Sequence, residues 1–102
     1  MKKVLWVQQA LDGQQEIIDY ILEKFGAKAA FDFQEKVERA EEIISQSPRL
    51  MPVESVDMTS KYVYRSIIIG RLSKMLYVER ENDIIVVDFW DVRQDPNKHT
   101  LG

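Results

Sequence analysis

Few residues in this sequence could do chemistry through a metal or a thiol. The 102-residue chain contains no cysteine and one histidine, His99. Without cysteine, disulfides and thiolate metal sites are excluded, and a single imidazole cannot form a multi-histidine metal centre. We therefore expect no metal and no cofactor. The remaining candidates for chemistry are cationic side chains, tyrosines and His99.

The charge balance argues against a dedicated nucleic-acid binder. The chain has 14 Lys and Arg against 17 Asp and Glu, a net charge of −3, and a pI near 5.1. Nucleic-acid-binding proteins are usually basic, because neutralising phosphates supplies most of their affinity. A local basic patch remains compatible with this balance. A hydrophobic content of 45% and a charged content of 30% are typical of a globular domain.

Helical patterns follow a short first strand. Residues 3–7 form an apolar run that predicts the strand. Asp12, with a glutamine three residues on, predicts the N-cap of a helix that ends at Gly26. A second helix is predicted from Ala27, and it must end by Pro48, because proline disfavours helix in the residue before it.

The second half of the chain is rich in β-forming residues. Residues 48–60 contain two prolines and no clear period, which predicts an ordered loop. Runs at 61–69, 73–80 and 84–92 are separated by three-residue spacers, which favour hairpins and an antiparallel meander. The polar tail, residues 93–102, is expected to leave the sheet.

The order of these elements is β-α-α-β-β-β, which predicts the α+β class. We expect a helix hairpin packed on one face of an antiparallel sheet of about four strands, with the first strand beside the later meander. A length of 102 residues predicts one domain, 1–102. The N-terminus lacks the ~7–15 apolar residues of a secretory signal and the ~20 of a membrane helix, so we expect a cytoplasmic protein.

Short motifs along the chain resemble those of the RelE/ParE toxin superfamily. They are Ile17-Ile18-Asp19-Tyr20-Ile21, Ala29-Ala30-x-x-Phe33, Pro48 after the second helix, Tyr64-Arg65 followed by Lys74-Met75-Leu76-Tyr77, and Val92-Arg93-x-Asp95-Pro96. Their order and spacing cover nearly the whole chain. The resemblance implies the toxin of a type II toxin–antitoxin (plasmid or genome stabilisation) system, neutralised by a cognate protein antitoxin in a hetero-oligomer.

Two modes of growth inhibition occur in this superfamily. RelE-type members are metal-independent endoribonucleases that cut mRNA on the translating ribosome, whereas ParE-type members poison DNA gyrase without nuclease chemistry. Under the nuclease alternative, the resemblance implies Arg65, Lys74 and Arg93 as cations around the phosphate. It also implies His99 as the acid that protonates the leaving oxygen.

Each of these four residues also has an ordinary structural interpretation. Arg65 and Lys74 can form cross-strand pairs with carboxylates such as Glu79. Arg93 can pair with neighbouring aspartates, and His99 lies three residues from the chain end, where chains often fray. Lys74 also lacks the planar fork with which an arginine binds phosphate.

The acidity and the thin catalytic set favour a ParE-type toxin that poisons DNA gyrase. One alternative is the RelE-type mRNA endoribonuclease, whose target is the ribosome with its message. A second alternative is a non-toxic module that only binds the antitoxin. No membrane partner is expected under any of the three.

Overall fold

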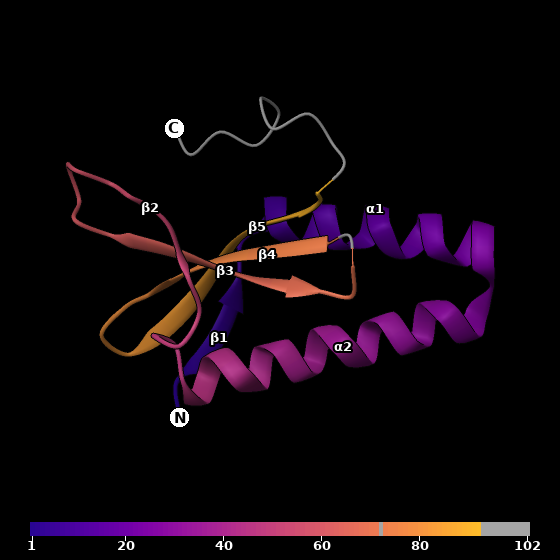
Figure 1. Cartoon of the computed structure of the whole chain (residues 1–102), viewed down its shortest axis with the longest axis horizontal. Coiled ribbons are helices and arrows are strands. Elements are labelled where there is room, and N and C mark those ends of the chain that lie inside the picture. Colours follow the sequence, from indigo (N-terminus) through magenta and orange to yellow (C-terminus); the bar gives the residue numbers. More distant parts are fainter. Residues whose placement is uncertain (72, 93–102) are drawn as a thin grey trace.

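The computed structural model describes residues 1–71 and 73–92, so the predicted tail, residues 93–102 with Arg93 and His99, lies outside the described part. A helix hairpin covers one face of a single sheet (Figure 1). The elements are strand β1 (Lys3–Trp6), helices α1 (Gln8–Phe25) and α2 (Ala27–Gln46), and strands β2 (Val53–Val56), β3 (Val63–Ile69), β4 (Ser73–Glu79) and β5 (Asp83–Asp91).

The sheet has the strand order β1-β5-β4-β3-β2. Strands β3 to β5 form the predicted antiparallel meander, and β1 lies beside β5 as expected. The α+β class is therefore confirmed. The sheet is nevertheless mixed and has five strands, because β1 runs parallel to β5 and β2 adds an edge strand. No hairpin joins β1 to β5, so no local turn determined their relative direction.

Helix α1 begins at Gln8, about one turn before the predicted N-cap. Val7 precedes it with extended backbone angles (φ −78°, ψ 160°) and makes no side-chain cap. Asp12 lies inside the helix, where its carboxylate accepts a hydrogen bond from the Gln8 amide (2.8 Å). The predicted helix ends are confirmed: Gly26, with φ of 92°, follows α1, and Ser47, just before Pro48, follows α2.

The predicted loop at residues 48–60 contains β2, so that prediction was wrong in part. Val53 and Val56 are both about half exposed, at 51% and 47%. Residues 53–56 do not alternate between buried and exposed positions as a half-buried strand does. The strand is recognised only from its pairing with β3. An edge strand of this kind is held by backbone hydrogen bonds more than by buried side chains.

The core lies between the helices and the sheet. From α2, Phe33, Val37, Ala40 and Ile44 are buried, and their spacing of four, three and four residues places them on one face of the helix. Its partners on the sheet are also buried: Ile67 and Ile69 of β3, Met75 and Tyr77 of β4, and Ile84, Val86 and Phe89 of β5. The ring of Phe89 contacts Phe33 edge-on (centroids 6.1 Å apart) and Trp6 (5.8 Å).

A β-bulge in β5 places the side chains of Val86 and Phe89, which are three residues apart, on the same face of the sheet. Leu76 pairs with Asp88 and Tyr77 pairs with Val86, which leaves Val87 without a partner on β4. Alternation along a regular strand would place Val86 and Phe89 on opposite faces. The extra residue restores both to the core.

Helix α1 approaches β5 most closely at Gly13. A Cβ atom added there would lie 2.0 Å from the carbonyl oxygen of Phe89 and 3.1 Å from its carbonyl carbon. Both contacts are with backbone, which cannot move aside as the end of a flexible side chain does. Glycine is therefore required at this point of the helix–sheet contact. No helix in the described part of the chain combines the length and the apolar character needed to cross a membrane.

Tyr77, on the central strand β4, forms a hydrogen bond with the segment that follows α2. This side chain is fully buried, and its hydroxyl donates a hydrogen bond to the Pro48 carbonyl (2.7 Å). Burial raises the pKa of the Tyr77 phenol from its ordinary value of 10.0 to about 12. The neutral phenol is the form that can donate this bond, so the fold favours it.

Replacing Gly13 by alanine should destabilise the protein. In an exposed helix interior the same change stabilises by about 1 kcal/mol, but here the methyl group would meet the Phe89 carbonyl. We expect a net loss of about 1–3 kcal/mol, as for other overpacked sites. Urea unfolding of Gly13→Ala measures it, with the exposed Glu23→Ala on the same helix as the control. Equal stability of Gly13→Ala and the parent would contradict this close approach.

Replacing Tyr77 by phenylalanine should cost about 1–3 kcal/mol at pH 8, because the Pro48 carbonyl loses its donor. The pKa of the Tyr77 phenol is higher in the folded than in the unfolded protein. Its contribution to stability is therefore fully present at pH values below the unfolded pKa of 10.0, and it is lost as the pH rises toward the folded pKa of about 12. The stability difference between the parent and Tyr77→Phe should therefore shrink between pH 9 and 11 in urea titrations. The other titrating groups are present in both proteins, so their effects cancel in the difference. A stability difference that stays constant with pH would refute the hydrogen bond from the Tyr77 phenol to Pro48.

Candidate functional site

Lys74 lies on the face of the sheet that the helices leave uncovered. Its ammonium group contacts a carboxylate oxygen of Glu54 at 2.5 Å, and the Ser66 hydroxyl donates to the same oxygen at 2.6 Å. These hydrogen bonds, that of Lys74 first, lower the pKa of Glu54 from its ordinary value. Lys74 therefore pairs with a carboxylate, as the structural interpretation expected, but the partner comes from β2.

Arg65 has a different environment. Its guanidinium donates to the backbone carbonyls of Met51 (2.7 Å) and Arg49 (3.3 Å), in the segment that follows α2. Met51 itself packs against the core. Among the described residues, Arg65 therefore hydrogen-bonds to backbone carbonyls and not to the expected carboxylate, and it holds the loop after α2.

Arg65 and Lys74 project from opposite faces of the sheet. Arg65 pairs with Tyr77 across β3 and β4, and Lys74 pairs with Ile68. Paired residues share a face, successive residues alternate, and this ladder is regular from Tyr64 to Ile69. Because three positions separate Arg65 from Ile68, the two cations cannot meet at one phosphate. Arg93 and His99, the other two predicted residues, lie outside the described part of the chain.

Glu79 joins two cations that the sequence did not pair with it. Its carboxylate contacts the Lys2 ammonium at 2.8 Å and the Arg49 guanidinium at 2.9 Å. The hydrogen bond from Lys2 comes first among the causes that lower the Glu79 pKa, and that from Arg49 adds to it. Lys2 also donates to the Arg80 carbonyl (2.6 Å), so this cluster fastens the N-terminal segment to β4. Within residues 1–71 and 73–92, acidic and histidine side chains do not gather into a group of three that could hold a metal.

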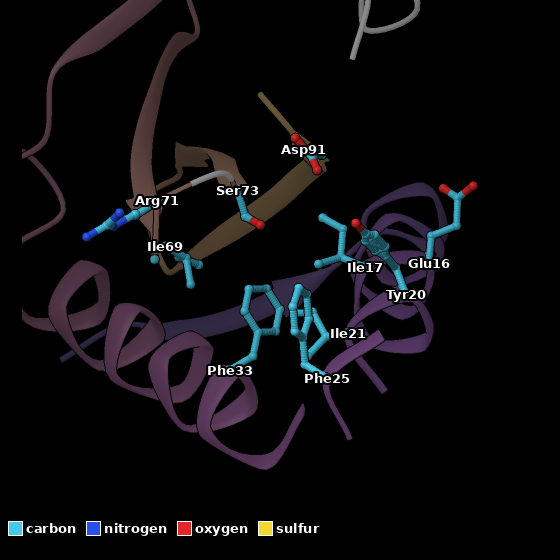
Figure 2. Close-up of a pocket in the computed structure, with 11 residues that line it drawn as sticks. Glu16, Ile17, Tyr20, Ile21, Phe25, Phe33, Ile69, Arg71, Ser73 and Asp91 are labelled. Atoms are coloured by element: carbon cyan, nitrogen blue, oxygen red, sulfur yellow. The ribbon is translucent and has the colours of Figure 1, made fainter. Parts of the chain in front are cut away.

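A pocket of about 410 Å³ opens between the helix hairpin and the turn that joins β3 to β4. Figure 2 shows the side chains of Ile21, Phe25 and Phe33 pointing into it, whereas Arg71 points away. Ile17, Tyr20 and Ile69 complete the apolar lining, and Glu16, Gly70, Arg71, Ser73 and Asp91 form the polar part. The pocket thus combines an apolar floor with charged groups of both signs.

The apolar lining of this pocket is unusually open to solvent at one end. Phe25, the last residue of α1, is 69% exposed, and Tyr20 is 40% exposed. Their rings meet edge-on with centroids 6.4 Å apart. Exposed aromatic side chains beside a concave surface are typical of a site that binds another molecule. Phe25 is hard to recognise as a binding residue from the sequence, because it continues the helical spacing of the apolar residues Ile17, Ile21 and Leu22.

Known structures share this fold. A chain from the chromosomal ParDE TA system of P. aeruginosa superposes with a TM-score of 0.71 at 13% sequence identity, covering 90% of this chain and 97% of the other. At this identity the likeness concerns the fold alone. Among curated proteins, no sequence is significantly similar to the chain.

The family comparison is more specific. Residues 4–96 match the model of the ParE toxin of type II toxin–antitoxin systems, parDE. This match spans nearly the whole chain, from β1 into the tail, and it agrees with the order and spacing of the motifs in the sequence. A parDE system implies a cognate ParD antitoxin as the partner. The chain therefore belongs to the family of ParE toxins of parDE type II toxin–antitoxin systems.

Proposed function

We propose that this chain arrests growth in the bacterial cytoplasm by poisoning DNA gyrase, and that a ParD antitoxin holds it inactive in a hetero-oligomer. The observation that carries the choice of gyrase over mRNA is the separation of Arg65 and Lys74 onto opposite faces of the sheet. Family membership supports the same choice, because ParE-type toxins act without nuclease chemistry.

RNA cleavage would place strong demands on the sheet. Cations must converge on the phosphate to stabilise the negative charge of its transition state. Here the Lys74 ammonium is neutralised by Glu54, and Arg65 is directed to the backbone of the loop after α2. Arg65 and Lys74 are not placed to act on the same phosphate. A nuclease would therefore depend on Arg93 and His99, together with either Arg65 or Lys74 but not both.

The pocket at the helix hairpin supports the antitoxin half of the proposal. Its apolar floor fits one or two bulky apolar side chains, which usually supply most of the energy of a protein–protein contact. Glu16, which also lines the pocket, favours a segment with a neighbouring lysine or arginine. We assign this pocket to an apolar anchor of the antitoxin, flanked by a basic residue.

Gyrase poisoning is tested with the purified chain, gyrase and supercoiled plasmid. We expect gyrase-dependent double-strand cleavage that disappears when the antitoxin is added in equimolar amount. Mapping of mRNA 5′ ends after induced expression, in cells without the antitoxin, provides the opposing test. Growth arrest with intact mRNA supports the proposal. New cuts within translated messages, with gyrase unaffected, would replace it by the nuclease alternative, and normal growth would leave a module that only binds antitoxin.

Single substitutions separate the two mechanisms in the same cells. Under the gyrase proposal, Lys74→Ala and His99→Ala should each retain growth arrest, because neither side chain performs chemistry. Under the nuclease alternative, Arg93→Ala and His99→Ala should each abolish it without unfolding the protein. Circular dichroism of each purified variant provides the folding control.

Replacing Phe25 by alanine should weaken binding of the antitoxin about 30-fold, the effect of losing an aromatic anchor worth about 2 kcal/mol. The side chain is largely exposed, so stability should change little. Titration calorimetry measures the affinity. Phe31→Ala is the matched control, because Phe31 is 60% exposed on α2 but does not line the pocket. Equal affinities for the two variants would show that the antitoxin does not use this pocket.

A further inference from the structure

Strand β2 carries one residue more than the stretch of β3 with which it pairs. Val53 pairs with Arg65 and Ser55 pairs with Tyr64, so Glu54 has no partner across the ladder. Such an extra residue is a β-bulge, which changes the direction of a side chain and often occurs at sheet edges. Here the Glu54 carboxylate reaches over β3 to Lys74 of β4.

The donors that hold this carboxylate belong to two inner strands. Ser66 of β3 is 2% exposed, and the Lys74 side chain is 25% exposed. The two strands pair without irregularity from Tyr64 to Ile69, so the backbone positions of Ser66 and Lys74 are fixed relative to each other, and both side chains reach the same oxygen of Glu54. Together they form a built binding site for a carboxylate, and its two hydrogen bonds to an ionised acceptor belong to the stronger class.

The rest of β2 is lightly attached. It is four residues long and has one neighbouring strand, since it lies at the edge of the sheet. None of its residues belongs to the core cluster, and Val53 and Val56 are about half exposed. Among the interactions of residues 1–71 and 73–92, β2 contributes one side chain, that of Glu54, to hydrogen bonds and ion pairs. A weakly packed edge element beside a well-packed sheet is expected to open locally.

We infer that Glu54 is a carboxylate latch: its insertion between Ser66 and Lys74 holds β2 on the sheet, and its release lets β2 open while the other four strands stay folded. The open form exposes two features at once. The outer backbone groups of β3 lose their partners, and the site formed by Ser66 and Lys74 becomes accessible to another carboxylate. An edge in this state accepts a further extended strand. This inference is independent of the cellular target.

Native-state hydrogen exchange of the full chain, followed by NMR, tests the latch. In Glu54→Ala and in Lys74→Met, we expect amides of residues 53–56 to exchange about 10-fold faster or more, because a charge-assisted hydrogen bond is lost. The double variant should exchange no faster than either single variant, since both remove the same contact. Amides of residues 84–89 in β5 should keep their protection.

Arg80→Ala is the control, because it removes a partly exposed ion pair, with Asp83, at the turn between β4 and β5. It should leave the exchange of residues 53–56 unchanged. Unchanged exchange of β2 in Glu54→Ala would overturn the latch. Acceleration of residues 84–89 by the same factor as residues 53–56 would also overturn it, because β2 would then open only when the whole sheet unfolds.

Discussion

At Gly13 the backbone of α1 lies directly against the Phe89 carbonyl of β5, and this contact fixes where the helix hairpin sits on the sheet. The bulge that follows Val86 turns Phe89 toward the helices, where its ring packs against Phe33 of α2 and Trp6 of β1. The two helices and the two neighbouring strands thus meet at one residue. With the hairpin held there, its free end stands over the turn between β3 and β4, and the apolar pocket forms between them.

The two faces of the sheet carry different polar contacts. On the face toward the helices, Arg65 and Tyr77 fasten the segment between α2 and β2 through backbone carbonyls. On the other face, Lys74 and Ser66 hold Glu54. Cations that sequence reasoning grouped into one catalytic set therefore stabilise two separate segments. This separation favours a toxin that acts by binding a protein target over one that cleaves RNA.

Much of the fold could be predicted because its signals are local. Apolar residues at helical spacing marked the buried face of α2, and Pro48 marked its end. Alternating β-rich runs with short spacers gave the meander from β3 to β5. The N-cap at Asp12 was wrong, because the capping-box spacing of Asp12 and Gln15 also fits the interior of a helix, where Asp12 accepts a hydrogen bond from Gln8. Strand β2 was missed, since its apolar residues are exposed and its pairing depends on β3.

By itself, the sequence determined the α+β class, the order of the elements other than β2, and the family, since these follow from periodicity, turn residues and short motifs along the chain. Only the tertiary structure decided the parallel pairing of β1 with β5, the pocket beside Phe25 and the partners of Arg65 and Lys74. The physical reason is that strand register assigns each side chain to a face. Register is set by pairing between residues far apart in the chain, so a residue list alone cannot show which cations meet.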